Sequence, residues 1–149
     1  MKFTFMPARE DDKAYLLELR KLTMTEHLEK AGLNVSDDDH ELRVNHAFDC
    51  AFLIVHKDSR IGAIKCREDQ EKAVILQLQI HPEFQRKGFG QAVVEQIMSD
   101  VQPKWIELKV LKDNPAISLY ERIGFSIEAE DSHEYFMTTR GTTPPAGHK

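Results

Sequence analysis

The chain has 149 residues, and its 25 acidic side chains outnumber its 20 Lys and Arg, so its formal net charge at pH 7 is −5. This length fits one domain with a sizeable core, and the acidic balance argues against a nucleic-acid backbone as the main partner. No apolar run approaches the roughly 20 residues that span a bilayer, and the N-terminus lacks the apolar segment and cleavage site of a signal peptide. We therefore expect a cytoplasmic protein without membrane attachment.

The first half of the chain predicts a strand, two helices and a hairpin. Apolar and polar residues alternate at the start, and Leu16, Leu19 and Leu22 then recur at helical spacing until Gly32 and Asn34 end the pattern. An acidic stretch opens the second helix, where the helix dipole favours negative charge. In chain order, the expected elements are a strand at residues 2–6, helices at 14–28 and 38–48, and strands at 51–55 and 61–67.

The second half predicts strands that alternate with helices. Leu76, Leu78 and Ile80 point to one side of a strand, while Gln77 and Gln79 point to the other, away from the core. This order predicts an α/β fold, in which a mixed sheet has helices on both faces. The expected elements are a strand at 73–80, a helix from about 90 with Val93, Val94, Ile97, Met98 and Val101 on one face, a strand at 105–111, a helix from Pro115 to Gly124, and strands at 125–130 and 134–139.

The stretch 85–90, which reads Gln-Arg-Lys-Gly-Phe-Gly, joins the central strand to the helix that follows it. Backbone N–H groups at a helix N-terminus have no intrahelical partner and carry the positive end of the helix dipole. Gly88 and Gly90 lack the Cβ atoms that would block close approach, and Arg86 and Lys87 add positive charge at the rim. These residues predict an anion site suited to a pyrophosphate.

This loop has other interpretations. The plainest is a loop with two glycines that happens to begin a helix. The stretch lacks the three spaced glycines and the later acidic residue of the dinucleotide-binding fingerprint, and no Gly-Lys-Ser/Thr of a Walker loop follows. A nucleotide-binding protein that holds ATP on the same loop is a competing hypothesis.

Two motifs in sequence order resemble the GCN5-related N-acetyltransferases. Gln-x-x-Gly-x-Gly at 85–90 follows a strand that ends in Leu-Gln-Ile-His-Pro at 78–82. The segment 114–125, Asn-Pro-Ala-Ile-Ser-Leu-Tyr-Glu-Arg-Ile-Gly-Phe, is similar to that family's second signature, Asn-x-x-Ala-x-x-Leu-Tyr-x-x-x-Gly-Phe. Together the motifs cover residues 74–125, about a third of the chain. The resemblance implies that family's acyltransferase fold.

The resemblance also implies acetyl-CoA as the co-substrate and no metal. In that family, the pyrophosphate sits on the backbone amides of the loop, and the pantetheine arm pairs with the backbone of the preceding strand. That strand diverges from the next one, here 105–111, to open a cleft. Because only the strand's backbone is used, its apolar side chains remain free to build the core. The resemblance assigns cofactor contacts to Leu78, Gln79, Ile80, Gln85, Arg86, Lys87, Gly88, Phe89, Gly90, Asn114 and Tyr120.

Tyr120 and Asn114 are the side chains that the resemblance places near the thioester. Tyr120 matches the family tyrosine beside the cofactor sulfur, and a phenol with a pKa of about 10 can protonate a thiolate of similar basicity. Asn114 matches a residue that often contacts the pantetheine arm. The structural alternatives are a packed tyrosine and a helix N-cap. The amide of Ile80 is the implied donor to the developing oxyanion.

The sequence leaves the general base and the acceptor open. Many relatives carry a glutamate on the central strand, where this chain has Gln77 and Gln79, which cannot accept a proton at neutral pH. The candidates for the base are Glu107, His81, His40, Glu41 and His46, and each of them can equally be a solvated surface group. The first two helices normally form the acceptor wall, which points to Met24, His27, His40 and His46.

The histidines and cysteines do not form a metal-binding pattern. His27, His40 and His46 lack a convincing ligand spacing. Cys50 and Cys66 are interpreted as buried free thiols, because disulfides are rare in cytosolic proteins.

Two functions stand side by side. One is an N-acetyltransferase that moves an acetyl group from acetyl-CoA to a primary amine of a small molecule or peptide, by direct attack in a ternary complex. The other is a non-catalytic acetyl-CoA-binding or sensor module on the same fold. We expect a single domain at 1–140 and a disordered tail at 141–149, which holds two prolines and two glycines. Relatives are often homodimers, and a second copy could join the edge of the final strand pair.

Overall fold

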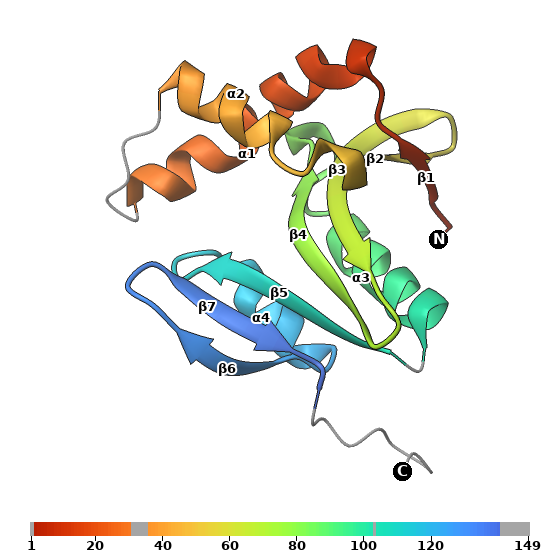
Figure 1. Cartoon of the computed structure of the whole chain (residues 1–149), viewed down its shortest axis with the longest axis vertical. Coiled ribbons are helices and arrows are strands. Elements are labelled where there is room, and N and C mark those ends of the chain that lie inside the picture. Colours follow the sequence, from red (N-terminus) through yellow and green to blue (C-terminus); the bar gives the residue numbers. More distant parts are fainter. Residues whose placement is uncertain (1, 31–35, 103, 141–149) are drawn as a thin grey trace.

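The computed structural model describes residues 2–30, 36–102 and 104–140, which form a seven-stranded sheet in the order β1-β2-β3-β4-β5-β7-β6 (Figure 1). This mixed sheet with helices confirms the predicted α/β fold. The predicted helix end at Gly32 and Asn34 and the tail at 141–149 lie outside the described residues. The strands are β1 (Thr4–Pro7), β2 (Ala51–His56), β3 (Ser59–Glu68), β4 (Lys72–Ile80), β5 (Trp105–Leu111), β6 (Ser126–Glu130) and β7 (Glu134–Thr138). The helices are α1 (Lys13–Lys30), α2 (Asp37–Asn45), α3 (Phe89–Val101) and α4 (Ala116–Arg122), with short 3-10 turns at Glu10–Asp12, Phe48–Cys50 and Pro82–Phe84.

The parallel ladder between β4 and β5 is short. Lys72 to Ile75 pair with Trp105 to Leu108, whereas β4 continues to Ile80 and β5 to Leu111. The other strand pairs of the sheet are antiparallel. Figure 1 shows β4 and β5 meeting at one end and separating toward the other. The sheet therefore consists of two halves, β1 to β4 and β5 to β7, that are joined along only part of their length.

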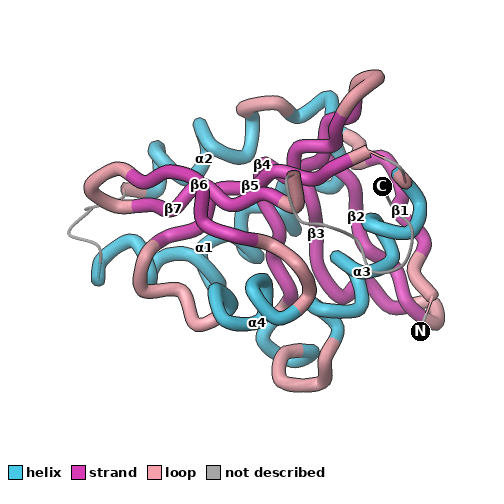
Figure 2. Tube along the Cα trace, turned by 90° about the horizontal axis from the view of Figure 1, so that it is seen from below, coloured by secondary structure: helices cyan, strands magenta, loops and turns pink. Residues whose placement is uncertain are grey.

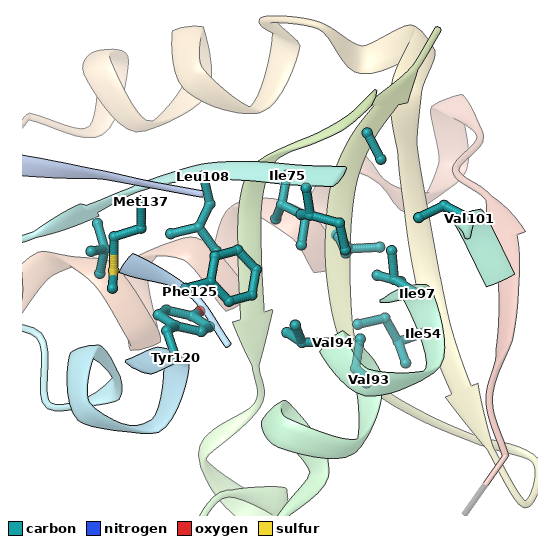
Figure 3. Packing of buried hydrophobic residues seen from close by; sticks show 14 of the residues in the cluster. Ile54, Ile75, Val93, Val94, Ile97, Val101, Leu108, Tyr120, Phe125 and Met137 are labelled. Carbon is teal, nitrogen blue, oxygen red and sulfur yellow. The ribbon is translucent and has the colours of Figure 1, made fainter. Parts of the chain in front are cut away.

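Helices α3 and α4 cover one face of the sheet with the main core. Val93, Val94, Ile97 and Val101 of α3 are buried, as their helical spacing predicts. They pack in one cluster with buried residues of both half-sheets (Figure 3). Figure 2 shows α3 and α4 on one side of the strands and α2 on the other. Side-chain packing thus joins the two halves where the backbone ladder does not.

Helices α1 and α2 cover the other face with a smaller core. Leu16 and Leu19 of α1 and Val44 of α2 pack on the strands there. Lys65 of β3 lies below α2, and its Nζ donates to the backbone oxygens of Arg43, Val44 and His46 at 2.6, 3.1 and 2.5 Å. Burial lowers the pKa of Lys65 to about 8, while the three acceptors oppose this by favouring the ammonium. Lys65 ties the last turn of α2 to the sheet.

Helix α2 is shorter than the sequence predicts. It ends at Asn45 rather than Phe48, because His46 is extended and Ala47 adopts a left-handed conformation with φ 54°. The following residues, Phe48 to Cys50, form a 3-10 turn that leads into β2. Hydrophobic spacing alone does not reveal this backbone reversal.

The predicted orientation of β4 needs a correction. The register changes from Lys65 opposite Gln77 to Cys66 opposite Ile75, so Leu76 is left out of the pairing and is 42% exposed. Gln79, which was predicted to face away from the core, is only 5% exposed, because the α1–α2 layer covers that face. The prediction that Leu78 and Ile80 face the main core is confirmed.

Candidate active site

A cleft of about 150 Å³ opens where β4 and β5 separate. One part of its lining comes from α1 and α2, another from the two strands, and another from α4 and the segment before it. It is lined by Arg20, Met24, Arg43, Ile75, Leu76, Gln77, Leu78, Leu108, Lys109, Val110, Leu111, Asn114, Tyr120 and Glu134. The cleft thus passes between the two half-sheets, with α1 and α2 at one opening and α4 at the other.

The loop between β4 and α3 presents backbone amides at a helix N-terminus. The first helical bond runs from the Ala92 N–H to the Gly88 oxygen, so the N–H groups of Phe89, Gly90 and Gln91 lie ahead of it. Gly88 caps α3 with φ 82°, a conformation that favours glycine. A Cβ on Gly90 would meet only Ile80 Cγ1, at 3.9 Å. This geometry suits an anion.

The side chains of the loop act mainly on the loop itself. Gln85 Nε2 donates to the Ile80 oxygen at 2.8 Å, which holds the loop against the end of β4. Arg86 and Lys87 are exposed at the rim, as predicted, and the Arg86 backbone has φ 64°. The Phe89 ring packs against the rings of Phe84 and others at the base of the loop. Positive charge therefore surrounds the helix N-terminus without blocking it.

The last part of β4 has one strand neighbour. Leu78 pairs with Ile64 of β3 and Ile80 with Gly62, but the ladder to β5 stops at Ile75. The backbone edge that faces the cleft is therefore unpaired by β5 from Leu76 onward, which leaves room for an extended ligand to add as a strand.

Tyr120 lies against the cleft with its ring in the main core. It is 9% exposed, and its ring centroid lies 5.6 Å from that of Phe125 (Figure 3). Burial raises the pKa of Tyr120 to about 12, so its hydroxyl keeps its proton throughout the neutral range. Asn114 Oδ1 accepts from the Ala116 N–H at 2.8 Å, which is the capping role, and Asn114 also lines the cleft. The capping bond and a place in the cleft are compatible.

Known proteins resemble this chain in sequence and in fold. A family model described as FR47-like protein matches residues 51–136, more than half of the chain. The chain belongs to the FR47-like family. Together with the relatives described next, this match confirms the resemblance to the GCN5-related N-acetyltransferases.

The relatives of this FR47-like chain are N-acetyltransferases. The ribosomal protein bS18-alanine N-acetyltransferase of Escherichia coli K12 is 30% identical over 76 residues, which are 48% of this chain and 50% of that protein. The chain thus matches about half the length of that curated relative. A paiA N-acetyltransferase from Thermoplasma acidophilum, solved with coenzyme A, has a TM-score of 0.67 at 20% identity and covers 93% of this chain and 98% of its own. Arabidopsis thaliana Naa50, solved with the bisubstrate analogue CoA-Ac-MVNAL, has a TM-score of 0.61 at 18% identity over 93% and 98% of the two chains. At these identities the two structures establish the fold.

The candidates for a general base do not line the cleft of this FR47-like chain. Glu107 binds Lys72 Nζ at 3.1 Å and Trp105 Nε1 at 2.9 Å at the closed end of the ladder. His81 accepts from the Glu83 N–H at 3.1 Å in the turn after β4. His40 is buried and accepts from Arg20 Nε at 3.2 Å, and burial lowers its pKa. Glu41 and His46 are exposed.

The residues that the sequence predicts for the acceptor wall do not all line the cleft. Met24 lines the cleft, whereas His40 and His46 do not. The side chain of His27 lies outside the described residues. The walls instead carry charged side chains that sequence reasoning missed, namely Arg20, Arg43, Lys109 and Glu134. Arg20 had a usable signal, because it follows the buried Leu19 and Leu16 on the inner side of α1.

A smaller enclosed space lies beneath α1 and α2. Its volume of about 10 Å³ is room for roughly one water. Arg20, Lys65, Gln77 and Gln79 are among the residues that line it, and Gln79 Nε2 is buried without a hydrogen-bond partner. This space is too small for a substrate.

The described residues contain no group of three or more His, Cys, Asp or Glu side chains that could hold a metal ion. Cys50 and Cys66 are free thiols, Cys50 buried and Cys66 half-buried, and burial raises the pKa of Cys66 to about 11. No helix in the described part of the chain has both the length and the apolar character needed to cross a membrane.

Proposed function

We propose that this member of the FR47-like family is an acetyl-CoA-dependent N-acetyltransferase whose acceptor is a primary amine of a small molecule or peptide. The observation that carries the proposal is that one cleft joins an unpaired stretch of β4 to Tyr120, next to a glycine-rich helix N-terminus. The helix N-terminus suits a pyrophosphate, the unpaired strand edge suits an extended arm, and the tyrosine suits a thioester.

In this proposal the chain binds the co-substrate mainly through its backbone. The amides of the loop 85–90 hold the pyrophosphate, with Arg86 and Lys87 at the rim and Gln85 bracing the loop. The backbone of residues 78–80 pairs with the pantetheine arm, and Asn114 lies beside that arm. Free N–H groups, absent Cβ atoms and an unpaired strand edge fit such a molecule.

The proposed reaction is a direct transfer in a ternary complex. The amine nitrogen forms a bond to the thioester carbon, and the carbon–sulfur bond breaks. The Ile80 amide donates to the developing oxyanion, and the Tyr120 hydroxyl protonates the departing sulfur. An acceptor that arrives as an ammonium loses two protons in all, of which one replaces that of Tyr120 and one leaves to solvent. Burial raises the pKa of Tyr120 to about 12, so its hydroxyl carries a proton at neutral pH.

The relatives favour a peptide or protein amine within this class of acceptors. One relative is a ribosomal protein bS18-alanine N-acetyltransferase, and one structural neighbour was solved with the bisubstrate analogue CoA-Ac-MVNAL. We further propose that residues 1–140 form one acetyltransferase domain in the cytoplasm. The exposed edge strand β6 is the surface through which a homodimer would form.

The first test is thermal unfolding with acetyl-CoA and, separately, with ATP. At 100 times Kd, binding adds about 2.7 kcal/mol of stability, which raises the Tm by roughly 2–4 °C or somewhat more. Acetyl-CoA should produce this shift and ATP should not. Gly90→Glu should abolish the shift by placing a carboxylate among the amides. Gln102→Glu adds the same charge at the other end of α3 and should keep the shift.

Thiol release with a panel of amines then tests catalysis. Tyr120→Phe should reduce kcat about 10²–10⁴-fold without changing the acetyl-CoA shift. Binding without turnover of any amine would favour the non-catalytic sensor module. If acetyl-CoA does not raise the Tm, the loop is not a cofactor site, and both the acetyltransferase and the sensor module are refuted. A rise in Tm with ATP alone would favour a nucleotide-binding protein.

A further inference from the structure

Among the described residues, two arginines on the α1–α2 wall of the cleft have no acidic partner. Arg20 is 5% exposed, and its Nε donates to His40 Nδ1 at 3.2 Å. Within the described part of the chain, no carboxylate lies within ion-pair distance of Arg20 or Arg43, and the Arg20 terminal nitrogens have no hydrogen-bond partner. These terminal nitrogens are not among the fully buried unpaired atoms of the described residues, and Arg20 lines the cleft, so its guanidinium fork is open to a carboxylate or phosphate that enters there.

The positive charges on this wall also repel one another. Burial and, as the smaller cause, the charge of Arg43 together lower the pKa of Arg20 to about 10. Lys65 lies close enough to both arginines for their charges to lower its pKa as well. The whole chain has five more acidic than basic side chains, so acidic partners were available in the sequence. An anion that enters the cleft would relieve the repulsion.

A carboxylate lies on the opposite half-sheet. Glu134, the first residue of β7, lines the same cleft and pairs in the ladder with Leu111 of β5. Its carboxylate has no ion-pair partner among the described residues. The cleft therefore presents guanidinium groups from α1 and α2 and a carboxylate from β7. A ligand that carries both charges would match this arrangement.

We propose that the acceptor is an amine whose own molecule carries a carboxylate close to the amine, with Arg20 and Arg43 binding the carboxylate and Glu134 the ammonium. This inference rests on the proposed acetyltransferase function and specifies the substrate class of the same cleft. Two sources supply this chemistry, namely a free amino acid and a peptide with an acidic second residue. In either case, Glu134 binds the acceptor amine as an ammonium and receives one of its protons before attack.

Paired acceptors test the proposal on the full chain. L-alanine is compared with L-alaninamide, and the amide of the dipeptide Ala-Asp with that of Ala-Asn, so that each pair differs only by a carboxylate. The kcat/KM for thiol release should favour the carboxylate member of at least one pair by about tenfold or more. The pair that shows the preference identifies the source.

Product binding gives a second readout that needs no turnover. By calorimetry without acetyl-CoA, the N-acetylated carboxylate member of the preferred pair should bind more tightly than its amide. Arg43→Ala removes an exposed side chain and should abolish both preferences. Arg67→Ala removes the same charge from a side chain that pairs with Asp49 outside the cleft, and it should leave them intact.

Each outcome decides the matter. Equal use of both members of each pair by a chain that binds acetyl-CoA and acetylates amines would overturn this inference and leave the proposed function standing. A preference that survives both Arg43→Ala and Arg20→Met would remove these arginines from the acceptor site. A chain that neither binds acetyl-CoA nor acetylates any amine would overturn both proposals.

Discussion

Gly62 of β3 is the position where one added methyl group should disturb the candidate site most. An ideal Cβ there would lie 2.1 Å from the Gln79 oxygen and 3.1 Å from both the Gln79 carbonyl carbon and Ile80 Cα. A carbon and a carbonyl oxygen in adjacent strands normally stay about 3.3–3.6 Å apart, so β3 and β4 must separate by more than about 1 Å. All three neighbours are backbone atoms, and no side-chain rotation can relieve the contact.

We expect Gly62→Ala to destabilise the fold by about 3 kcal/mol, at the upper end of the range for overpacking. With a urea m-value of about 2 kcal/mol/M, the unfolding midpoint should fall by roughly 1.5 M. Because the displaced residues, Gln79 and Ile80, belong to the proposed acetyl-CoA strand, affinity for acetyl-CoA should fall as well. The assay is urea unfolding followed by circular dichroism, with and without acetyl-CoA.

For stability in the absence of acetyl-CoA, Gly90→Ala is the matched control. Its Cβ would meet only Ile80 Cγ1 at 3.9 Å, an ordinary contact, inside the first turn of α3. Replacing glycine by alanine in a helix is expected to be neutral or to stabilise by about 0.5–1 kcal/mol. If Gly62→Ala unfolds at the same urea concentration as the wild type, the close approach of β3 to β4 described above is wrong.

Two further predictions concern buried polar groups. The folded-state pKa of Tyr120 is raised from 10.0 to about 12, so its stabilising contribution is complete below pH 10 and is lost as the pH rises toward 12. Relative to Tyr120→Phe, the wild type should lose about 2–3 kcal/mol over this window in urea unfolding at stepped pH; parallel curves would refute the burial of the hydroxyl. Lys65→Met removes the donor to three carbonyls of α2 and should destabilise the fold by about 2–3 kcal/mol at pH 7, whereas Lys104→Met, which removes the surface ion pair to Glu68, should cost less than about 1 kcal/mol.

The sequence predicts the elements of this fold well wherever periodicity and core packing agree. The apolar face of α3 and the limits of β5 are those expected from hydrophobic spacing, because each element buries one regular face. The predicted end of α2 was wrong, because no residue pattern indicates that Ala47 adopts a left-handed conformation. The prediction that Gln79 faces away from the core was wrong for another reason. Two polar residues on a strand indicate solvent, but Gln79 is buried beside the enclosed space that Arg20 of α1 and Lys65 of β3 also line, while Gln77 is half-buried.

The sequence points to the backbone parts of the candidate site and to Tyr120, but not to the charged side chains of the cleft. Two motifs locate the loop at 85–90 and Tyr120, because glycines and a helix start constrain local geometry. Arg20, Arg43 and Glu134 come from three elements that only the tertiary fold brings to one cleft. The same applies to Glu107, which qualifies by residue type but is held by Lys72 and Trp105 at the closed end of the ladder.

The short ladder between β4 and β5 has a mechanical consequence. On β4, only Lys72 to Ile75 pair with β5, so beyond Ile75 the two halves of the sheet are held together by side-chain packing and not by backbone hydrogen bonds. A ligand strand that pairs with the free edge of β4 would supply the hydrogen bonds that the chain itself does not make. Backbone hydrogen bonding along the free edge of β4 would then be complete only while the ligand is bound.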